Sequence, residues 1–381
     1  MDVESILRPS RLFFVLVGFW PSENKKKPKL CRIKTYLIGI FVVTLAIDQC
    51  RTMLTLGTDA ASLAESVTMT YLLRFYWYSV DAVGLIVMST KVIPFVVQRD
   101  SLLSMLSKTN GLSKHEEASN GQKIVKHWKL RHTIAVKYLT RLYLIVLVTY
   151  ISAPLILQDK GFPLRGNFPS FIVNTSWYIL AYVTESIMLS LATSGVLVCD
   201  MLLILFVCDL CSELNCTALL LEELGQGQRD FTTIVEKHVA ALNYGKSFCD
   251  VTSVVFLFQA IVTTSAICLA GYTAMKTTST IILTKMLMVL LTTMMQLFIN
   301  CYIGEIITEA FLIVRTAIED SDWLFCPSKD QKGAFLILLR TEKPLRLGVG
   351  TFGVMNLKSF TEFMYNALSY LAVLNTMIRG Q

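Results

Sequence analysis

The stretch 172–207 reads IVNTSWYILAYVTESIMLSLATSGVLVCDMLLILFV, and within it only Glu185 and Asp200 carry a charge. A hydrocarbon core of about 30 Å is crossed by a helix of about 20 mostly apolar residues. Backbone groups inside lipid must be hydrogen-bonded within the chain, which favours a helix over an open sheet. We therefore interpret 172–207 as a membrane-spanning helix that continues beyond the bilayer.

Six further stretches of similar character flank this one. The seven predicted spans are 35–56, 68–97, 133–157, 172–207, 247–274, 281–314 and 347–378. The chain of 381 residues is 54% hydrophobic and only 17% charged, with a mean hydropathy of +0.55. Soluble domains carry about 25% charged residues. The sequence thus predicts an all-α polytopic membrane protein.

The basic residues alternate between the connections. Lysine and arginine are frequent before the first span, between the second and third spans, and before the last span, whereas 57–67 has none and 158–171 has only Lys160 and Arg165. Basic residues favour the cytoplasmic side. The N-terminus is therefore predicted inside the cell and the C-terminus outside. The net charge of +7 fits this topology better than binding to nucleic acid.

The predicted organisation has four parts. Residues 1–34 form a cytoplasmic segment with a short membrane-associated helix, and 35–315 a six-helix transmembrane bundle with cytoplasmic extensions. Residues 316–346 form a cytoplasmic anchor helix, and 347–381 the last spanning helix. The outer connections are short, so a ligand site is expected between the helices.

Most of the ten cysteines fall in spans or in cytoplasmic connections, where a reducing environment keeps them as thiols. Cys208, Cys211 and Cys216 with His238 could form a metal site, but the spacing lacks a second CxxC pair, and buried thiols are the better interpretation. We expect no metal and no cofactor. The four histidines lie in cytoplasmic segments without partners for catalysis, so we expect solvated side chains and no enzyme activity.

A polar stripe runs along the last span. Its members recur at steps of three or four residues and share one helix face: Asn356, Ser359, Glu362, Asn366, Ser369, Val373 and Thr376. Such a stripe must face protein or water. Copies around a symmetry axis could enclose a pore, with Val373 as an apolar gate and Glu362 favouring cations. Alternatively, the stripe hydrogen-bonds neighbouring helices within one subunit.

Several motifs resemble those of insect odorant receptors. The stretches 344–348 (PLRLG) and 352–357 (FGVMNL), followed by Phe360 and Ser369-Tyr370, are similar to the C-terminal motif of that family. Gly304-Glu305, Asp322-Trp323, the stretch 258–272 and Asp200 in its apolar run are weaker matches.

This resemblance implies a tetrameric, ligand-gated, non-selective cation channel in the plasma membrane of olfactory neurons. Val373 then matches the hydrophobic gate, with Thr376 and Met377 just outside it. The connection 209–246 is shorter than in the family's co-receptor, which implies an odour-tuning subunit that assembles with that co-receptor. A gustatory-type channel is the nearest alternative.

The family's pocket for a small volatile hydrophobic ligand lies in the outer half of the second, third, fourth and sixth spans. The residues at that depth are Tyr71, Arg74, Phe75, Tyr78, Leu147, Tyr150, Ile151, Tyr178, Tyr182, Glu185, Met188, Met288, Leu291, Thr292 and Met295. Ion pairing of Arg74 with Asp81 or Glu185 is predicted more strongly than contact of Arg74 with ligand.

Two other classes of membrane protein fit the sequence less well. A G-protein-coupled receptor would have an external N-terminus and an Asn-Pro-x-x-Tyr motif in its last span, and this sequence has no such motif. A transporter would show inverted repeats with broken helices, and none is evident.

Overall fold

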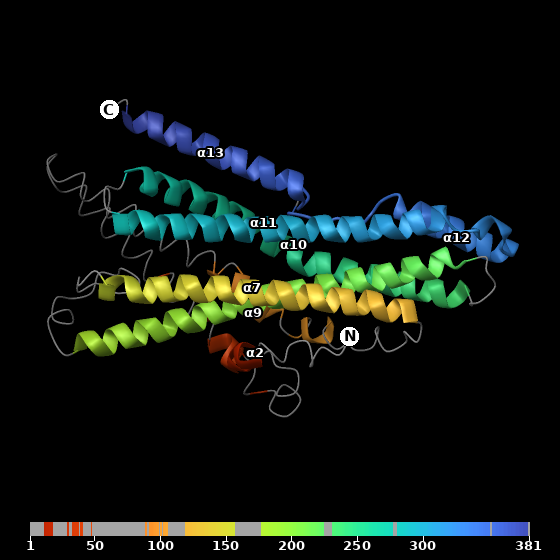
Figure 1. The fold of residues 1–381 in the computed structure, drawn as a ribbon, viewed down its shortest axis with the longest axis horizontal. Helices are drawn as coiled ribbons and strands as arrows, with labels where there is room; N and C mark the ends of the chain where they lie inside the picture. The colour runs from red at the N-terminus through yellow and green to blue at the C-terminus, as the bar shows by residue number, and fades with distance from the viewer. Residues whose placement is uncertain are drawn as a thin grey trace.

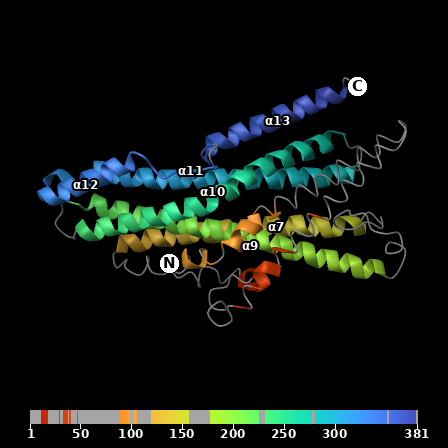
Figure 2. The same ribbon diagram turned by 180° about the vertical axis from the view of Figure 1, so that it is seen from behind.

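The computed structural model describes an elongated bundle of helices (Figures 1 and 2). The described residues are 11–17, 29, 33–37, 39–40, 47, 88–89, 91–98, 100, 102–105, 119–156, 177–224, 231–276, 280–350 and 353–379. Their helices are α2 (Arg11–Val17), α7 (Ser119–Ile156), α9 (Trp177–Glu222), α10 (Phe231–Lys276), α11 (Thr280–Glu319), the 3-10 turn η3 (Trp323–Phe325), α12 (Ser328–Thr341) and α13 (Leu357–Arg379).

Four of these helices, α7, α9, α10 and α11, are long and apolar enough to cross a membrane. They contain the predicted third to sixth spans. Helix α9 has 46 residues, which corresponds to about 69 Å at 1.5 Å per residue, or more than twice the thickness of a bilayer core. The predicted extensions beyond the membrane are therefore continuations of α9 and α10 rather than separate helices.

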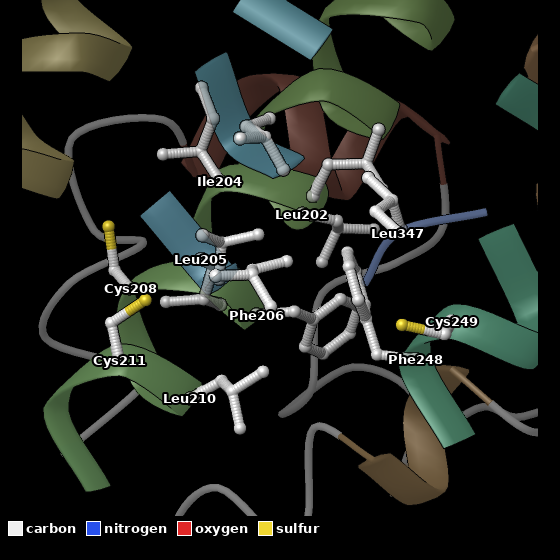
Figure 3. Close-up of a cluster of buried hydrophobic side chains, with 14 of the residues drawn as sticks. Leu202, Ile204, Leu205, Phe206, Cys208, Leu210, Cys211, Phe248, Cys249 and Leu347 are labelled. Atoms are coloured by element: carbon white, nitrogen blue, oxygen red, sulfur yellow. The ribbon is translucent and has the colours of Figure 1, made fainter. Parts of the chain in front are cut away.

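Helix α9 forms the centre of the bundle. It packs against α2, α7, α10 and α11, and its side chains from Ala192 to Leu214 are buried on every face. A helix that is apolar all round is stable only when surrounded in this way. Figure 3 shows part of this core, where Phe206 of α9 packs edge-on against Phe248 of α10, with Leu347 beside them. Phe14 of α2 is also buried in the core.

The described cysteines are free thiols, and Figure 3 shows Cys208 and Cys211 at one edge of the core. Within the described part of the chain no group of three His, Cys, Asp or Glu side chains is placed to hold a metal ion.

The last helix begins later than the apolar pattern predicts. Helix α13 starts at Leu357 rather than at 347, because Gly348 and Val354 pair in an antiparallel bridge before it. Gly350 has a φ of 56°, a conformation that glycine adopts readily and other residues rarely do. In Figure 1, α12 lies at the opposite end of the bundle from the C-terminus, and α13 runs along the outer side of α10 and α11.

Two histidines correct the expectation of solvated side chains. His132 on α7 and His238 on α10 are buried. Burial lowers the pKa of His132 to about 4. Burial, with a smaller contribution from the positive charge of Arg340, lowers the pKa of His238 to about 4. Both side chains are therefore neutral at pH 7. His127 is exposed as expected, and His115 lies outside the described residues.

Candidate ligand pocket and pore helix

The predicted pocket residues of the third and fourth spans face each other. The Tyr182 hydroxyl of α9 donates a hydrogen bond to the carbonyl oxygen of Ile151 on α7. Leu189 of α9 is buried against Met88, Leu147 and Tyr150. Three segments of the chain therefore meet around Leu189.

The other α9 residues line the same region. The rings of Tyr178 and Tyr182 lie 6.0 Å apart between centroids. Glu185 is buried one turn further along the helix, and Met188 is half-buried. Aromatic walls with a thioether and few polar groups are typical of sites for small apolar ligands.

The four predicted residues of α11 divide between two faces. Met288 and Thr292 are half-buried, and the Thr292 hydroxyl donates to the carbonyl oxygen of Met288 at 2.6 Å. Leu291 and Met295 are 54% and 42% exposed. The structure thus brings only Met288 and Thr292 toward the interior of the chain. Tyr71, Arg74, Phe75 and Tyr78 lie outside the described residues, so the pairing of Arg74 stays a prediction.

A buried polar network joins four segments at this level. Lys91 forms an ion pair with Asp200 of α9, and the other carboxylate oxygen of Asp200 accepts a 2.7 Å hydrogen bond from the Tyr143 hydroxyl of α7. Gln296 of α11 donates to the same hydroxyl at 3.2 Å. Lys91 is only 1% exposed. Tyr143 and Gln296 lie one helical turn from Leu147 and Thr292, so this network (Lys91, Tyr143, Asp200 and Gln296) borders the predicted pocket on its inner side.

Sequence reasoning missed this network. It weighed Arg74 and Glu185 as ionisable residues within spans but treated Asp200 only as a family match and left Lys91 aside. The available signal was the presence of opposite charges near the inner ends of the second and fourth apolar stretches. An ionisable residue inside a span needs a partner, so the sequence could have predicted an ion pair between Lys91 and Asp200.

Helix α13 packs on the bundle through one face. The Cys268 thiol of α10 lies 3.5 Å from the carbonyl oxygen of Ala367. The ring of Phe298 on α11 meets that of Phe360 edge-on, with centroids 5.5 Å apart. Gly271 leaves room for Leu371, since a Cβ at Gly271 would lie 3.2 Å from the Leu371 side chain.

The opposite face of α13 carries most of the polar stripe. Glu362, Asn366, Ser369, Val373 and Thr376 are all exposed, and Val373 is 50% exposed. The Thr376 hydroxyl donates to the carbonyl oxygen of Val373 at 2.9 Å. Glu362 lies 4.0 Å from Lys358, which is itself exposed. These side chains therefore point away from the described helices of their own chain.

The inner end of the stripe differs from the rest of it. Asn356 and Ser359 are half-buried and hydrogen-bond each other at the start of α13, so they cap the helix. Met377 belongs to α13, but its side chain lies outside the described residues.

Comparison with known proteins explains this arrangement. Residues 80–368 match the model of the family described as 7tm Odorant receptor. The chain belongs to the odorant receptor family. The receptor is 23% identical over 193 residues to odorant receptor 67c and 19% identical over 281 residues to odorant receptor 13a, both of Drosophila melanogaster. These alignments cover 49% and 65% of the receptor, and it spans 48% of the first relative and 67% of the second.

The fold agrees with solved structures of the same kind. The insect olfactory receptor OR5 from Machilis hrabei superposes with a TM-score of 0.80 at 16% identity, over 98% of the receptor and 99% of OR5. The structure of OR5 in complex with eugenol superposes with a TM-score of 0.77 at 17% identity, over 99% of the receptor and 100% of OR5. The matching relatives are odorant receptors rather than the co-receptor, which confirms the resemblance. Members of this family are receptors and not enzymes.

Proposed function

We propose that the receptor is an odour-tuning subunit of a ligand-gated, non-selective cation channel. The observation that carries this proposal is the exposure of the stripe on α13: its middle and outer members point away from the chain's own bundle. Lipid cannot satisfy such groups, and one helix cannot enclose water. Several copies of α13 around a symmetry axis would place the stripe on a shared conduit.

Each stripe residue then has a role in permeation. Val373 lies between polar positions, so a ring of these side chains would be a narrow apolar constriction that closes by losing water. Ser369 and Asn366 on one side, and Thr376 and Met377 on the other, would line the approaches. Glu362 would add negative charge toward the inner end and favour cations over anions.

The partners that complete the conduit would be the co-receptor and further copies of the receptor in a heterotetramer. An exposed apolar surface on η3 and α12 supports this proposal, because large apolar patches on a surface mark interaction sites. We call it the anchor patch, and its members are Leu324, Phe325, Phe335, Leu336 and Leu339, with Phe325 86% exposed. It lies at the end of the bundle assigned to the cytoplasm.

The ligand would be a small, volatile, hydrophobic molecule bound between α7, α9, α11 and the second span. Support comes from the half-buried side chains Leu147, Tyr150 and Met188 around Tyr182 and Leu189. OR5 of Machilis hrabei, which shares the fold, has been solved with eugenol. We place seven spans in the plasma membrane of an olfactory neuron, with the N-terminus inside.

Gating would follow from a difference in affinity between two states. A ligand shifts the closed–open equilibrium only if it binds the open state better. Pocket residues and α13 contacts lie on the same helix, α11, which contributes Met288 and Thr292 to one and Phe298 to the other. Filling the pocket would therefore displace α11 and α10 against α13 and widen the ring at Val373.

The test is to express the receptor with and without the co-receptor and to record current during application of a panel of volatile phenols, esters, alcohols and terpenes. We expect a rapid cation current with the co-receptor that persists in excised patches without nucleotides. A response that needs cytosolic components would support a metabotropic receptor instead, and a response to water-soluble tastants alone would support a gustatory-type channel.

A further inference from the structure

The chain between α12 and α13 contacts both α10 and α11 through its residues 346–350 and 353–356, which we call the linker. Within it, the amide of Met355 donates to the carbonyl oxygen of Leu347 at 2.7 Å, and the amide of Val349 donates to that of Gly353 at 2.9 Å. The amide of Gly350 donates to the Ser253 hydroxyl of α10 at 3.2 Å. The described residues of the linker are therefore hydrogen-bonded to each other and attached to α10.

Helix α11 approaches the other side of the linker at Gly304. A Cβ atom at Gly304 would lie 1.9 Å from the carbonyl oxygen of Met355, well inside any permitted contact. Only glycine allows the two backbones to come this close. The close approach also brings the following residue, Glu305, to the first turn of α13.

Glu305 caps α13 from a different helix. Its Oε2 atom accepts a hydrogen bond of 3.1 Å from the amide of Leu357, the first residue of α13. Asn356 caps the same first turn, because its Oδ1 atom accepts from the amide of Ser359 at 2.8 Å. The first amides of a helix have no partner within the helix, and a carboxylate there is also favoured by the helix dipole. Asn356 moves with α13, whereas Glu305 ties α13 to α11.

We propose that Glu305 is the positioning residue that fixes the inner end of α13 against α11, so that a displacement of α11 is transmitted to the pore helix. The importance of this position for current rests on the proposed function of α13. The geometric part, that Glu305 sets where α13 begins relative to α11, stands independently of it. Gly304 is the second component, since its lack of a side chain admits the Met355 backbone.

The test compares three variants of the full receptor expressed with the co-receptor. Glu305→Ala removes the acceptor, Glu305→Gln keeps an oxygen able to accept from Leu357, and Glu309→Ala removes an exposed carboxylate of the same helix as a matched control. Loss of a helix cap changes an equilibrium constant by about threefold to thirtyfold. We expect Glu305→Ala to change the resting current per surface channel by at least threefold, with unitary conductance and surface amount unchanged. Glu305→Gln and Glu309→Ala should stay within twofold of the parent.

A second measurement reports the position of α13 relative to α11 and does not depend on current. Cysteines replacing Phe298 and Phe360, whose rings are in contact, are joined by a short methanethiosulfonate crosslinker, and the linked peptides are quantified by mass spectrometry. We expect at least a threefold fall in crosslinking with Glu305→Ala and no such fall with Glu305→Gln or Glu309→Ala.

The two readouts separate the possible failures. Parental crosslinking and parental current in Glu305→Ala overturn the positioning role and leave the channel proposal intact. Reduced crosslinking in Glu305→Ala supports the positioning role. If the parental receptor at the cell surface also gives no current, with or without odorant, the channel proposal is overturned while the positioning role stands. A Glu305→Gln variant that behaves like Glu305→Ala overturns the hydrogen bond as the cause.

Discussion

Breaking the buried network should destabilise the receptor more than most single substitutions. Asp200→Ala would leave the ammonium of Lys91 unpaired at 1% exposure and remove the acceptor of the Tyr143 hydroxyl, which donates at 2.7 Å. Removing one partner of a buried ion pair costs about 3–5 kcal/mol. The entropy of unfolding is about 2.1 cal/mol/K per residue, so in a chain of 381 residues each kcal/mol lowers the melting temperature by about 1.2 °C, and the expected decrease is about 4–6 °C.

The assay heats purified receptor in lipid nanodiscs to a series of temperatures and measures by size-exclusion chromatography the fraction that stays folded, which gives the melting temperature. Asp250→Ala is the control, since Asp250 is an exposed carboxylate on α10, and it should change the melting temperature by less than ~2 °C. The double variant Lys91→Met with Asp200→Leu should recover most of the loss, because apolar replacement of both partners of a buried pair is often neutral. Equal losses for the single and the double variant, or a loss below ~2 °C for Asp200→Ala, would refute the reasoning.

Three further predictions concern the gate, the buried histidines and the anchor patch. Val373→Lys should reduce the cation current at least tenfold without altering which odorants activate, since a ring of positive charge would stand in the conduit. Tyr365→Lys, at an exposed position off the stripe, should change the current less than threefold. Patch recording checks both variants, and a change confined to odorant preference would contradict the gate assignment. As the pH falls from 6.5 toward 4 the receptor should lose stability, because His132 and His238 have a pKa of about 4 when folded and about 6.5 when unfolded. The unfolded state therefore binds protons first, which lowers the free energy of unfolding by up to about 1.4 kcal/mol per pH unit for each histidine. The melting temperature should depend less on pH between 7 and 5 in His238→Gln, and an unchanged dependence would exclude that residue as a cause. Phe325→Ser should weaken assembly with the co-receptor, as measured by the fraction of tetramer in native gels, while the fold of the chain keeps its melting temperature because Phe325 is 86% exposed.

The long apolar helices α7, α9, α10 and α11 and the shared face of the stripe could be predicted because each depends on local sequence. An apolar run such as 172–207 has one stable state in lipid, and the recurrence of Glu362, Asn366, Ser369, Val373 and Thr376 defines one side of any helix that contains them. The exposure of these five side chains follows from the helical period once the apolar side, with Phe360 and Ala367, packs on α10 and α11.

The buried network and the tie at Glu305 could not be predicted in the same way. Lys91 and Asp200 are 109 positions apart, and Glu305 lies 52 positions before Leu357. Periodicity within one segment carries no information on such contacts. The late start of α13 was missed for a different reason: the apolar residues of 347–355 continue the pattern of a span, while the glycines at 348, 350 and 353 favour a turn.

The stripe on α13 and the anchor patch are both left uncovered by the chain's own helices, and they lie toward opposite ends of the bundle (Figure 1). A partner that covered only one of them would leave the other exposed to water or lipid at a cost. The linker joins the elements that carry the two surfaces; Ser253 binds it at Gly350, and Glu305 binds the first residue of α13. The two surfaces are therefore presented at a set spacing, so under the proposed assembly a subunit seated on the anchor patch also has its own α13 beside this one. On this argument, shortening the linker should uncouple assembly from current: tetramers held by the anchor patch would still form, but their stripes would no longer meet on one axis.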